Sequence, residues 1–543
     1  MVKLSRSSKR VTTQSEKGGR EIGKTGGEGG KRSRGGDSTE DVLARGGQGG
    51  GRGREGEEKK ETKDNLRFED PYEDEFEEEE EMEEVVELDS DEEEGMDLEA
   101  FRAGRAGRAL GEDDMETEEA ATSAVPKVYC PGMEHELKEG EELVYDPSAY
   151  LMYHRLTPEW PCLSFDILQD TLGGGRTRFP ITMYAACGTQ ADVAGKNKLT
   201  VMKLTNMTKT YRRGGQESDS EEEEEDEEEE GMEGDPLLEQ CSIEHRGGVN
   251  RLRAMPQQSS TVATWAETGS VHLWDLRSLL AAVDSPSTAT HAAVLRRPLL
   301  SFSGHAEEGW AMDWSPVSTG RLATGDNKGD IHVWESKEAG QWALPDAKSP
   351  YRGHASSVED LQWSPTEASV FLSASSDQSL RVWDIRSKKG SMLSVPAHST
   401  DVNVCSWNRN VAYLVATGAD DGSFKVWDLR QFTANAQGDV RPIAHFTWHK
   451  GPITSAAWHP QDESILTFAS EDDTVSIWDL SVEEDEEEKK PSALPLSHLP
   501  PQLLFVHQGQ QEIKEVHFHA QVPGLLMTTA ADGFNVFKPA IGL

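Results

Sequence analysis

The sequence of 543 residues has few cysteines, no long apolar run and a low aromatic content. Its five cysteines are scattered and odd in number, without the short paired spacing that binds zinc or supports thiol chemistry. No apolar stretch approaches the ~20 residues that cross a membrane, and the basic N-terminus lacks the apolar region of a signal peptide. We therefore expect a soluble intracellular protein with reduced thiols.

The sequence also lacks the short motifs of common enzymes. It has no Gly-x-Ser-x-Gly turn, no Walker loop, no His-Glu-x-x-His motif and no strand-borne Gly-x-Gly-x-x-Gly. His517 and His519 alternate along an expected strand, but no third ligand follows at a suitable spacing, so packing is favoured over metal binding. The Glu runs lack the spaced ligands of a calcium site. We expect a protein without catalytic residues, bound metal or cofactor.

Acidic residues are concentrated in three tracts. Residues 61–120 hold 28 Asp and Glu against five Lys and Arg, residues 217–235 hold 14 against none, and residues 483–488 hold six against none. These tracts carry nearly all of the net charge of −44, so the remaining chain is almost neutral. Because blocks of like charge repel themselves and attract opposite charge, we predict disordered segments at 61–125, 217–235 and 483–493 that attract basic proteins and not DNA.

The N-terminal segment differs, because its basic side chains outnumber the acidic ones. Clusters at Ser8–Arg10 and Lys31–Arg34 and a Gly/Arg stretch over Arg45–Arg54 predict a disordered basic arm over positions 1–60. Such clusters are typical of nuclear-targeting signals and allow weak contact with RNA. A solvated tail with no such role is the alternative.

A repeated apolar run, closed by Trp and an acidic residue, organises the rest of the chain. The five copies are Val271–Asp275, Ile331–Glu335, Leu380–Asp384, Phe424–Asp428 and Val475–Asp479. Their Trp residues recur at intervals of 60, 49, 44 and 51 positions, which is typical of propeller blades. Short alternating strands bounded by turn residues lie between them. The pattern predicts an all-β fold of WD-type blades.

The clearest repeat places polar residues where they could form a hydrogen-bonded chain inside the blade. Its candidate members are His354, Ser373, Asp377 and Trp383. Other repeats offer His305, Asp326 and Trp334; His398, Asp420 and Trp427; and His449, Asp472 and Trp478. Because buried polar groups need partners, a structural role for these residues is favoured over a catalytic one.

Two weaker units raise the expected number of blades to seven. They span Ile181–Leu204, which lacks the Trp-Asp ending, and His507–Phe537, in which Phe537 replaces the Trp. A propeller ring closes when one terminus supplies a strand to the other terminal blade, because closure removes open edges. Cys162–Leu168 is the expected closing strand, and the predicted propeller covers residues 159–543.

A helix is predicted before that strand. Asp146 is placed as an N-cap and Pro147 as the first helical residue, and Thr157-Pro158 ends the segment. We expect this helix, Asp146–Leu156, within a helical region over residues 137–158 that packs on the flank of the propeller.

The chain from about Val128 onward resembles the histone-binding WD-repeat proteins of the chromatin-assembly type, and most closely their glutamate-rich, ribosome-biogenesis branch. The general resemblance rests on Glu159-Trp160-Pro161 before the propeller. The closer one rests on the acidic insert after the first blade and on the runs Leu163–Ile167, Ala186–Gln190, Ser357–Pro365 and Leu503–Gly509.

This resemblance implies a nucleolar chaperone, with some protein in the cytoplasm, that escorts a newly made large-subunit ribosomal protein and binds histones in some settings. In the histone-binding relatives, a client helix docks between the N-terminal helix and the last blade, beside an acidic loop. The matching positions here are Tyr150, Tyr153 and His154 on the flank and Glu484 and Asp485 in the acidic run. The length and purity of that run depart from the family pattern.

A second candidate surface is the face where the first strand of each blade begins. Its candidate residues for a basic partner are Glu308, Trp310, Glu359, Asp401 and Asn403, because an aromatic side chain among acids suits Arg or Lys. Plain solvation of these loop residues is the alternative.

Two further features stay open. Arg277, Arg386 and Arg430 each follow a Trp-Asp pair and resemble the Trp-Asp-x-Arg box of substrate receptors for cullin-type ubiquitin ligases, so a ligase adaptor is the alternative function, beside a histone chaperone in chromatin assembly. Ser90, Ser218 and Ser220 precede acidic runs that acidophilic kinases prefer, and phosphates there would deepen the negative field.

Overall fold

The computed structural model describes residues 2–6, 127–129, 141–210, 235–285, 297–337, 341–343, 345–432, 440–482 and 499–542. The basic arm beyond Arg6, the acidic tract 61–125 and nearly all of the two acidic inserts lie outside these residues, as do Ser90, Ser218, Ser220, Glu484 and Asp485. Among the described residues, no helix is long and apolar enough to span a membrane.

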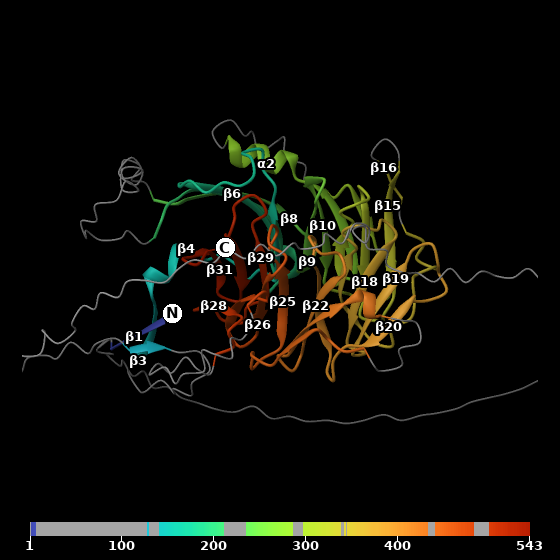
Figure 1. Ribbon diagram of the computed structural model, residues 1–543. Helices are drawn as coiled ribbons and strands as arrows, with labels where there is room; N and C mark the ends of the chain where they lie inside the picture. Colours follow the sequence, from blue (N-terminus) through green and yellow to red (C-terminus); the bar gives the residue numbers. More distant parts are fainter. Residues whose placement is uncertain are drawn as a thin grey trace, which may run out of the picture. The chain divides into compact units, whose positions relative to one another are not determined.

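Seven four-stranded antiparallel sheets form the blades of a propeller, which confirms the predicted fold class (Figure 1). From the innermost strand outward, the first three blades are β5 Ser164–Leu168, β6 Ile181–Gly188, β7 Lys198–Met207 and β8 Leu237–Glu244; β9 Val249–Met255, β10 Gln258–Ala266, β11 Ser270–Asp275 and β12 Leu300–Phe302; β13 Met312–Trp314, β14 Arg321–Gly325, β15 Ile331–Lys337 and β16 Gln341–Ala343.

The remaining blades follow the same order. They are β17 Val358–Trp363, β18 Val370–Ser375, β19 Ser379–Asp384 and β20 Leu393–Pro396; β21 Val402–Trp407, β22 Leu414–Ala419, β23 Phe424–Asp428 and β24 Ala444–Phe446; β25 Ile453–Trp458, β26 Ile465–Ser470, β27 Thr474–Asp479 and β28 Leu503–Gln508; β29 Glu515–Phe518, β30 Leu526–Ala530, β31 Gly533–Pro539 and β4 Tyr150–Leu156.

Few other elements occur in the described residues. The α-helix is α2, Arg277–Asp284, and the 3-10 turns are η1 Pro147–Ala149, η2 Ala194–Lys196 and η5 Leu429–Gln431. A separate three-stranded sheet places β1 Val2–Arg6 between β2 Lys127–Tyr129 and β3 Glu141–Tyr145.

The tryptophans of the repeats anchor the core between blades. They lie on the third strands, and each is at most 3% exposed: Trp274, Trp334, Trp383, Trp427 and Trp478. One apolar cluster joins the last blade to the first, since Met152 and Val536 pack with Phe165 and Met183. The ring is therefore closed by hydrophobic burial as well as by strand pairing.

The strand that closes the ring is β4, so the predicted helix over Asp146–Leu156 and the predicted closing strand Cys162–Leu168 are both wrong. β4 pairs with β31, Tyr153 opposite Phe537 and Leu156 opposite Phe534, and Figure 1 shows the two side by side. The propeller thus begins at Tyr150 and not at residue 159. Part of the predicted segment, Ser164–Leu168, is instead the innermost strand of the first blade.

Local signals explain the wrong helix. Asp146 does accept a hydrogen bond from the backbone N–H of Ser148, but the turn that it caps ends at Ala149. Beyond it, burial alternates from buried Tyr150 to exposed Leu151 to buried Met152, as in a strand. The open edge of β31 offers this segment backbone partners, and these override the Asp-Pro signal.

Side chains of the innermost strands bond to the backbone of the next blade around the central channel. Asp166 accepts from the N–H of Ala254, Asp313 from that of Trp363, and Asp360 from that of Cys405, at 2.8, 2.8 and 3.0 Å. An innermost strand is an edge, whose free N–H groups would otherwise lack partners. These contacts fix the angle between neighbouring blades.

Glu515 on β29 makes the most extensive of these links. Its carboxylate accepts hydrogen bonds from Ser164 Oγ and Phe165 N of the first blade, each at 2.9 Å. It also forms ion pairs with Arg251 and Arg253 of the second blade, each at 2.7 Å. Burial opposes its ionisation, but Arg253, His517 and Arg251 outweigh burial and hold the pKa of Glu515 well below its usual range.

Replacing Glu515 tests this link. We expect Glu515→Gln to lower the free energy of unfolding by about 3–5 kcal/mol at pH 7, because two buried guanidinium groups lose their counter-charge. Since the folded-state pKa is lowered, the stabilisation is present above the usual carboxyl pKa and is lost as pH falls through the lowered value, so the deficit shrinks in strong acid. Urea titration measures it. Exposed Glu512→Gln is the control, and equal stability of both variants would contradict the assignment.

Candidate binding surfaces

The polar residues of the clearest repeat form a continuous hydrogen-bonded chain. Trp383 Nε1–H donates to Ser373 Oγ at 2.7 Å, Ser373 Oγ contacts His354 Nε2, and His354 Nδ1 lies 2.9 Å from Asp377. Burial lowers the pKa of His354. Burial opposes ionisation of Asp377, yet hydrogen bonds from His354 and Ser379 lower its pKa. A neutral His and an ionised Asp inside the blade favour a structural role.

Three other blades vary this arrangement. His305 contacts Asp326 and Thr324, and Trp334 donates to the same threonine. His449 contacts Asp472, but its hydroxyl partner Ser476 lies on the same strand as Trp478.

The predicted partner Asp420 of His398 is wrong. In that blade, the Nδ1 atom of His398 lies 3.1 Å from Ser423 Oγ, and Thr417 joins its Nε2 atom to Trp427. Asp421 accepts from the N–H of Ser423 and thereby holds this serine. Asp421 follows its histidine at the same spacing along the chain as Asp377 follows His354, so that spacing could have identified it.

The rim residues predicted to bind a basic partner lie at the start of the innermost strands and already have intramolecular contacts. Glu308 accepts from Asn250 Nδ2 at 3.0 Å, and Glu359 accepts from Ser376 Oγ at 2.8 Å. The carbonyl of Trp310 accepts from Arg251, and that of Asp401 from the N–H of Asp420.

Asn403 differs from these rim residues. Its side-chain amide donates to the carbonyl of Ile453 in the next blade at 3.2 Å. This contact favours a role for Asn403 in joining blades over a role in partner binding.

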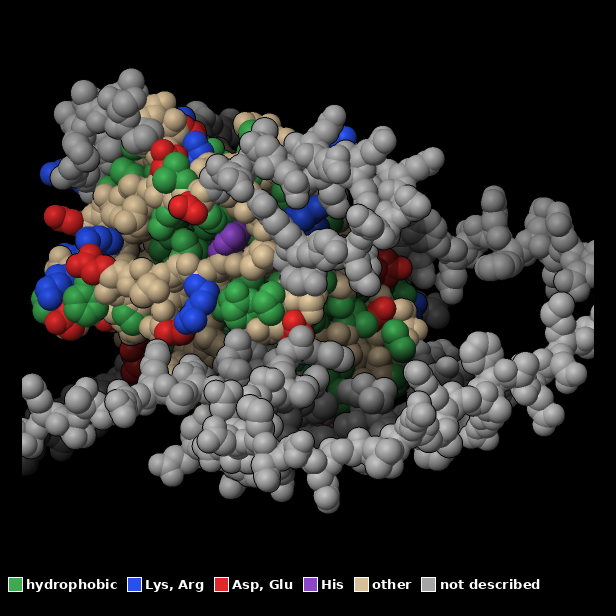
Figure 2. Space-filling model, turned by 90° about the vertical axis from the view of Figure 1, so that its left-hand side faces the viewer, with side chains coloured by type: hydrophobic (Ala, Val, Ile, Leu, Met, Phe, Trp, Pro, Cys, Tyr) green, Lys and Arg blue, Asp and Glu red, His purple; other side chains and the backbone are tan. Residues whose placement is uncertain are grey.

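The flank residues lie on β4. Tyr150 is buried, its hydroxyl lies 2.7 Å from His507 Nδ1, and burial raises its pKa, so it belongs to the core. Tyr153 is half-buried and packs at 5.0 Å between ring centres on Tyr145, which is 39% exposed. His154 is half-buried, and burial lowers its pKa. Figure 2 shows this side of the propeller, where apolar side chains reach the surface among acidic and basic ones.

Three arginines follow the third strands of their blades at equivalent places. Arg277, Arg386 and Arg430 each bind the Asp two residues before them, Asp275, Asp384 and Asp428. Their side chains stay 72%, 67% and 43% exposed, and Arg430 also lies 3.6 Å from the ring centre of Tyr413. The same exposed ion pair thus recurs on one face of the propeller.

Neither a metal centre nor a catalytic group is apparent among these surfaces. No cluster of three or more His, Cys, Asp or Glu side chains that could hold a metal occurs within the described ranges. Sequence reasoning missed the ionisable residues of the central channel, including Arg251, Arg253, Asp313 and Arg409. Polar residues that alternate along otherwise apolar innermost strands were the available signal.

Blades with a Trp-anchored hydrogen-bonded chain, closed into a ring of seven, define a WD-repeat β-propeller, a class of binding scaffolds. Three segments match the WD domain, G-beta repeat: 347–384, 390–428 and 440–479. Residues 140–208, which include β4 and the first blade to the end of β7, match a family described as histone-binding protein RBBP4 or a component of the CAF1 complex.

Similar proteins extend over most of the chain. Protein HEAT STRESS TOLERANT DWD 1 of Arabidopsis thaliana is 49% identical, covering 78% of this chain and 94% of the relative. Ribosome assembly protein rrb1 of Schizosaccharomyces pombe is 43% identical over 87% and 92%. Glutamate-rich WD repeat-containing protein 1 of Dictyostelium discoideum is 45% identical over 76% and 84%. The chain belongs to this family of glutamate-rich WD-repeat proteins.

Removing the shared hydroxyl tests the structural role of the buried chain. We expect Ser373→Ala to destabilise the protein by about 1–3 kcal/mol, because Trp383 Nε1–H and His354 Nε2 lose their common partner inside the blade. Thermal unfolding measures the loss. Ser394→Ala, an exposed serine on β20 of the same blade, is the matched control. A Ser373→Ala protein as stable as the control would contradict this role.

Proposed function

We propose that this protein is a non-enzymatic scaffold and chaperone in ribosome biogenesis that binds a newly made, basic large-subunit ribosomal protein in the nucleus, chiefly the nucleolus, and also binds histones. The observation that carries the proposal is the convergence of the three acidic segments on β4. Each segment joins the propeller at the last blade or at a blade next to it.

Contacts of the described residues support this convergence. The N–H of Thr210, just before the first acidic insert, donates to the carbonyl of Leu151 on β4, and the N–H of Tyr153 donates to Thr210 Oγ1. The second insert lies between β27 and β28, and Phe505 of β28 packs edge-on against Tyr150. The N-terminal acidic tract precedes β4 in the chain.

A basic client gains from this arrangement. Ribosomal proteins and histones are rich in Lys and Arg because they contact nucleic-acid phosphates, so before assembly these charges need a mask. Tethered Glu and Asp raise the local concentration of neutralising charge, and the rigid flank around Tyr153 and His154 adds shape-specific contacts. The names of the relatives support the proposal, since one is a ribosome assembly protein and the family that matches residues 140–208 is described as histone-binding.

Charge neutralisation tests the proposal. We expect Glu→Gln and Asp→Asn throughout 61–120, 217–235 and 483–488 to weaken binding of a purified large-subunit ribosomal protein by about 100-fold near physiological salt, because tethered charge no longer concentrates the client. The affinity should also depend less on salt. Binding titrations at two salt concentrations measure both effects.

The matched control separates the two candidate surfaces. Glu308→Gln, Glu359→Gln and Asp401→Asn neutralise the rim and leave the tracts intact. Unchanged binding by the tract variant together with lost binding by the rim variant would move the site to the rim.

A second function, adaptor of a cullin-type ubiquitin ligase, is favoured by the recurring exposed pairs of Arg277, Arg386 and Arg430 with their aspartates. If this function exists, Arg386→Ala combined with Arg430→Ala should abolish co-purification of the ligase's linker protein, because both guanidinium groups leave the shared face. The ribosomal client should still bind. Linker capture that persists in the double variant, or that never occurs with the unaltered chain, would exclude this route.

A further inference from the structure

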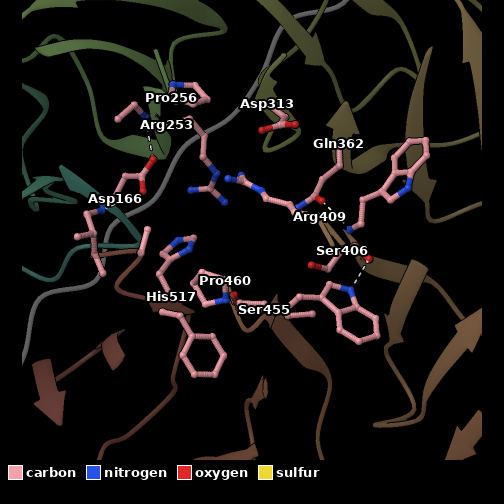
Figure 3. Close-up of a pocket in the computed structure, with 18 of the residues that line it drawn as sticks. Asp166, Arg253, Pro256, Asp313, Gln362, Ser406, Arg409, Ser455, Pro460 and His517 are labelled. Atoms are coloured by element: carbon pink, nitrogen blue, oxygen red, sulfur yellow. Dashed lines mark hydrogen bonds between the residues drawn. The ribbon is translucent and has the colours of Figure 1, made fainter. Parts of the chain in front are cut away.

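The central channel contains a cavity of about 220 Å³ that opens where the innermost strands end. Its wall includes Pro256, Pro460 and Ala520, which follow β9, β25 and β29 closely. Figure 3 shows Arg253 and Arg409 extending into this space from different blades. Room for several water molecules, and so for a small polyatomic ion, is present.

Most carboxylates of the channel are already engaged. Asp166 accepts from the N–H groups of Ile167 and Ala254, and Asp360 from those of Leu361 and Cys405. The two oxygens of Glu515 are engaged by the contacts of the first and second blades described above. These groups therefore have little capacity left for a cationic ligand.

Several hydrogen-bond donors face the cavity without a partner. Arg409 is exposed and makes no hydrogen bond or ion pair with the described part of the chain. Gln362 uses its side-chain carbonyl to accept from the N–H of Trp407 at 2.7 Å, which leaves its NH₂ group available. Asymmetry between free donors and engaged acceptors favours an anion.

Asp313 lies on the same wall and supports this interpretation. One of its oxygens accepts from the N–H of Trp363 at 2.8 Å. Burial raises the pKa of Asp313 to about 7, so near neutral pH the carboxyl is protonated in a large fraction of molecules and can donate a hydrogen bond to an anion.

We propose that the channel binds a phosphate group between Arg409, Gln362 and Asp313. Arg409 offers a planar fork of N–H donors that matches phosphate oxygens, and the other two donors approach from neighbouring blades. A tetrahedral oxyanion accepts from several directions at once, as this ring of donors requires. The group comes either from a free phosphate compound or from a phosphorylated side chain of a peptide that enters through the open end.

Calorimetric titration of the full-length protein tests the site with two probes, inorganic pyrophosphate and a short phosphoserine peptide. We expect saturable binding of at least one probe, weakened about tenfold or more by Arg409→Ala, because a charge-assisted hydrogen bond is lost. Arg386→Ala is the matched control, since it removes an exposed arginine that pairs with Asp384. Thermal unfolding of each variant checks that the propeller is intact.

The two probes distinguish the sources of the phosphate. Arginine-dependent binding of pyrophosphate alone assigns a free phosphate compound, and such binding of the peptide alone assigns a phosphorylated protein. The proposal is overturned if neither probe saturates, or if Arg409→Ala binds as well as Arg386→Ala. Client binding through the acidic tracts does not depend on either result.

Discussion

Glu515 is the group on which the closed ring depends. It belongs to the last blade, yet it holds the first blade through Ser164 Oγ and Phe165 N and the second through two arginines. A buried carboxylate is costly unless its charge and lone pairs are satisfied, and here all these partners come from blades formed early in the chain. The carboxylate is therefore satisfied only when the seven blades have closed, which couples its ionisation to the complete fold.

The other inter-blade contacts follow the same principle. Asp166, Asp313 and Asp360 cap backbone groups of neighbouring innermost strands, while β4 supplies the outer strand that the last blade lacks. The result is a closed, rigid ring, which suits a scaffold. Its surfaces differ in chemistry: ion-paired arginines recur on one face, acidic residues occupy the opposite rim, and the flank at β4 is where the charged tracts attach.

This division explains how a nearly neutral propeller can handle basic proteins. The fixed flank supplies a defined surface, and the tethered carboxylates supply charge that needs no fixed geometry. A channel lined with unengaged donors is a different kind of site, because its groups are held by several blades at once and face a space of small-molecule size.

The sequence by itself determined the blades, because the Trp-Asp period and the residues His354, Ser373, Asp377 and Trp383 belong to one short local unit of the chain. It also determined the charge tracts, which are a matter of composition. Only the tertiary structure decided that Tyr150–Leu156 is a strand and not a helix, because its partner β31 is far away along the chain and the local Asp-Pro signal favoured a turn. The Glu515 link and the channel were likewise decided by ring closure, since their members meet only when distant strands do.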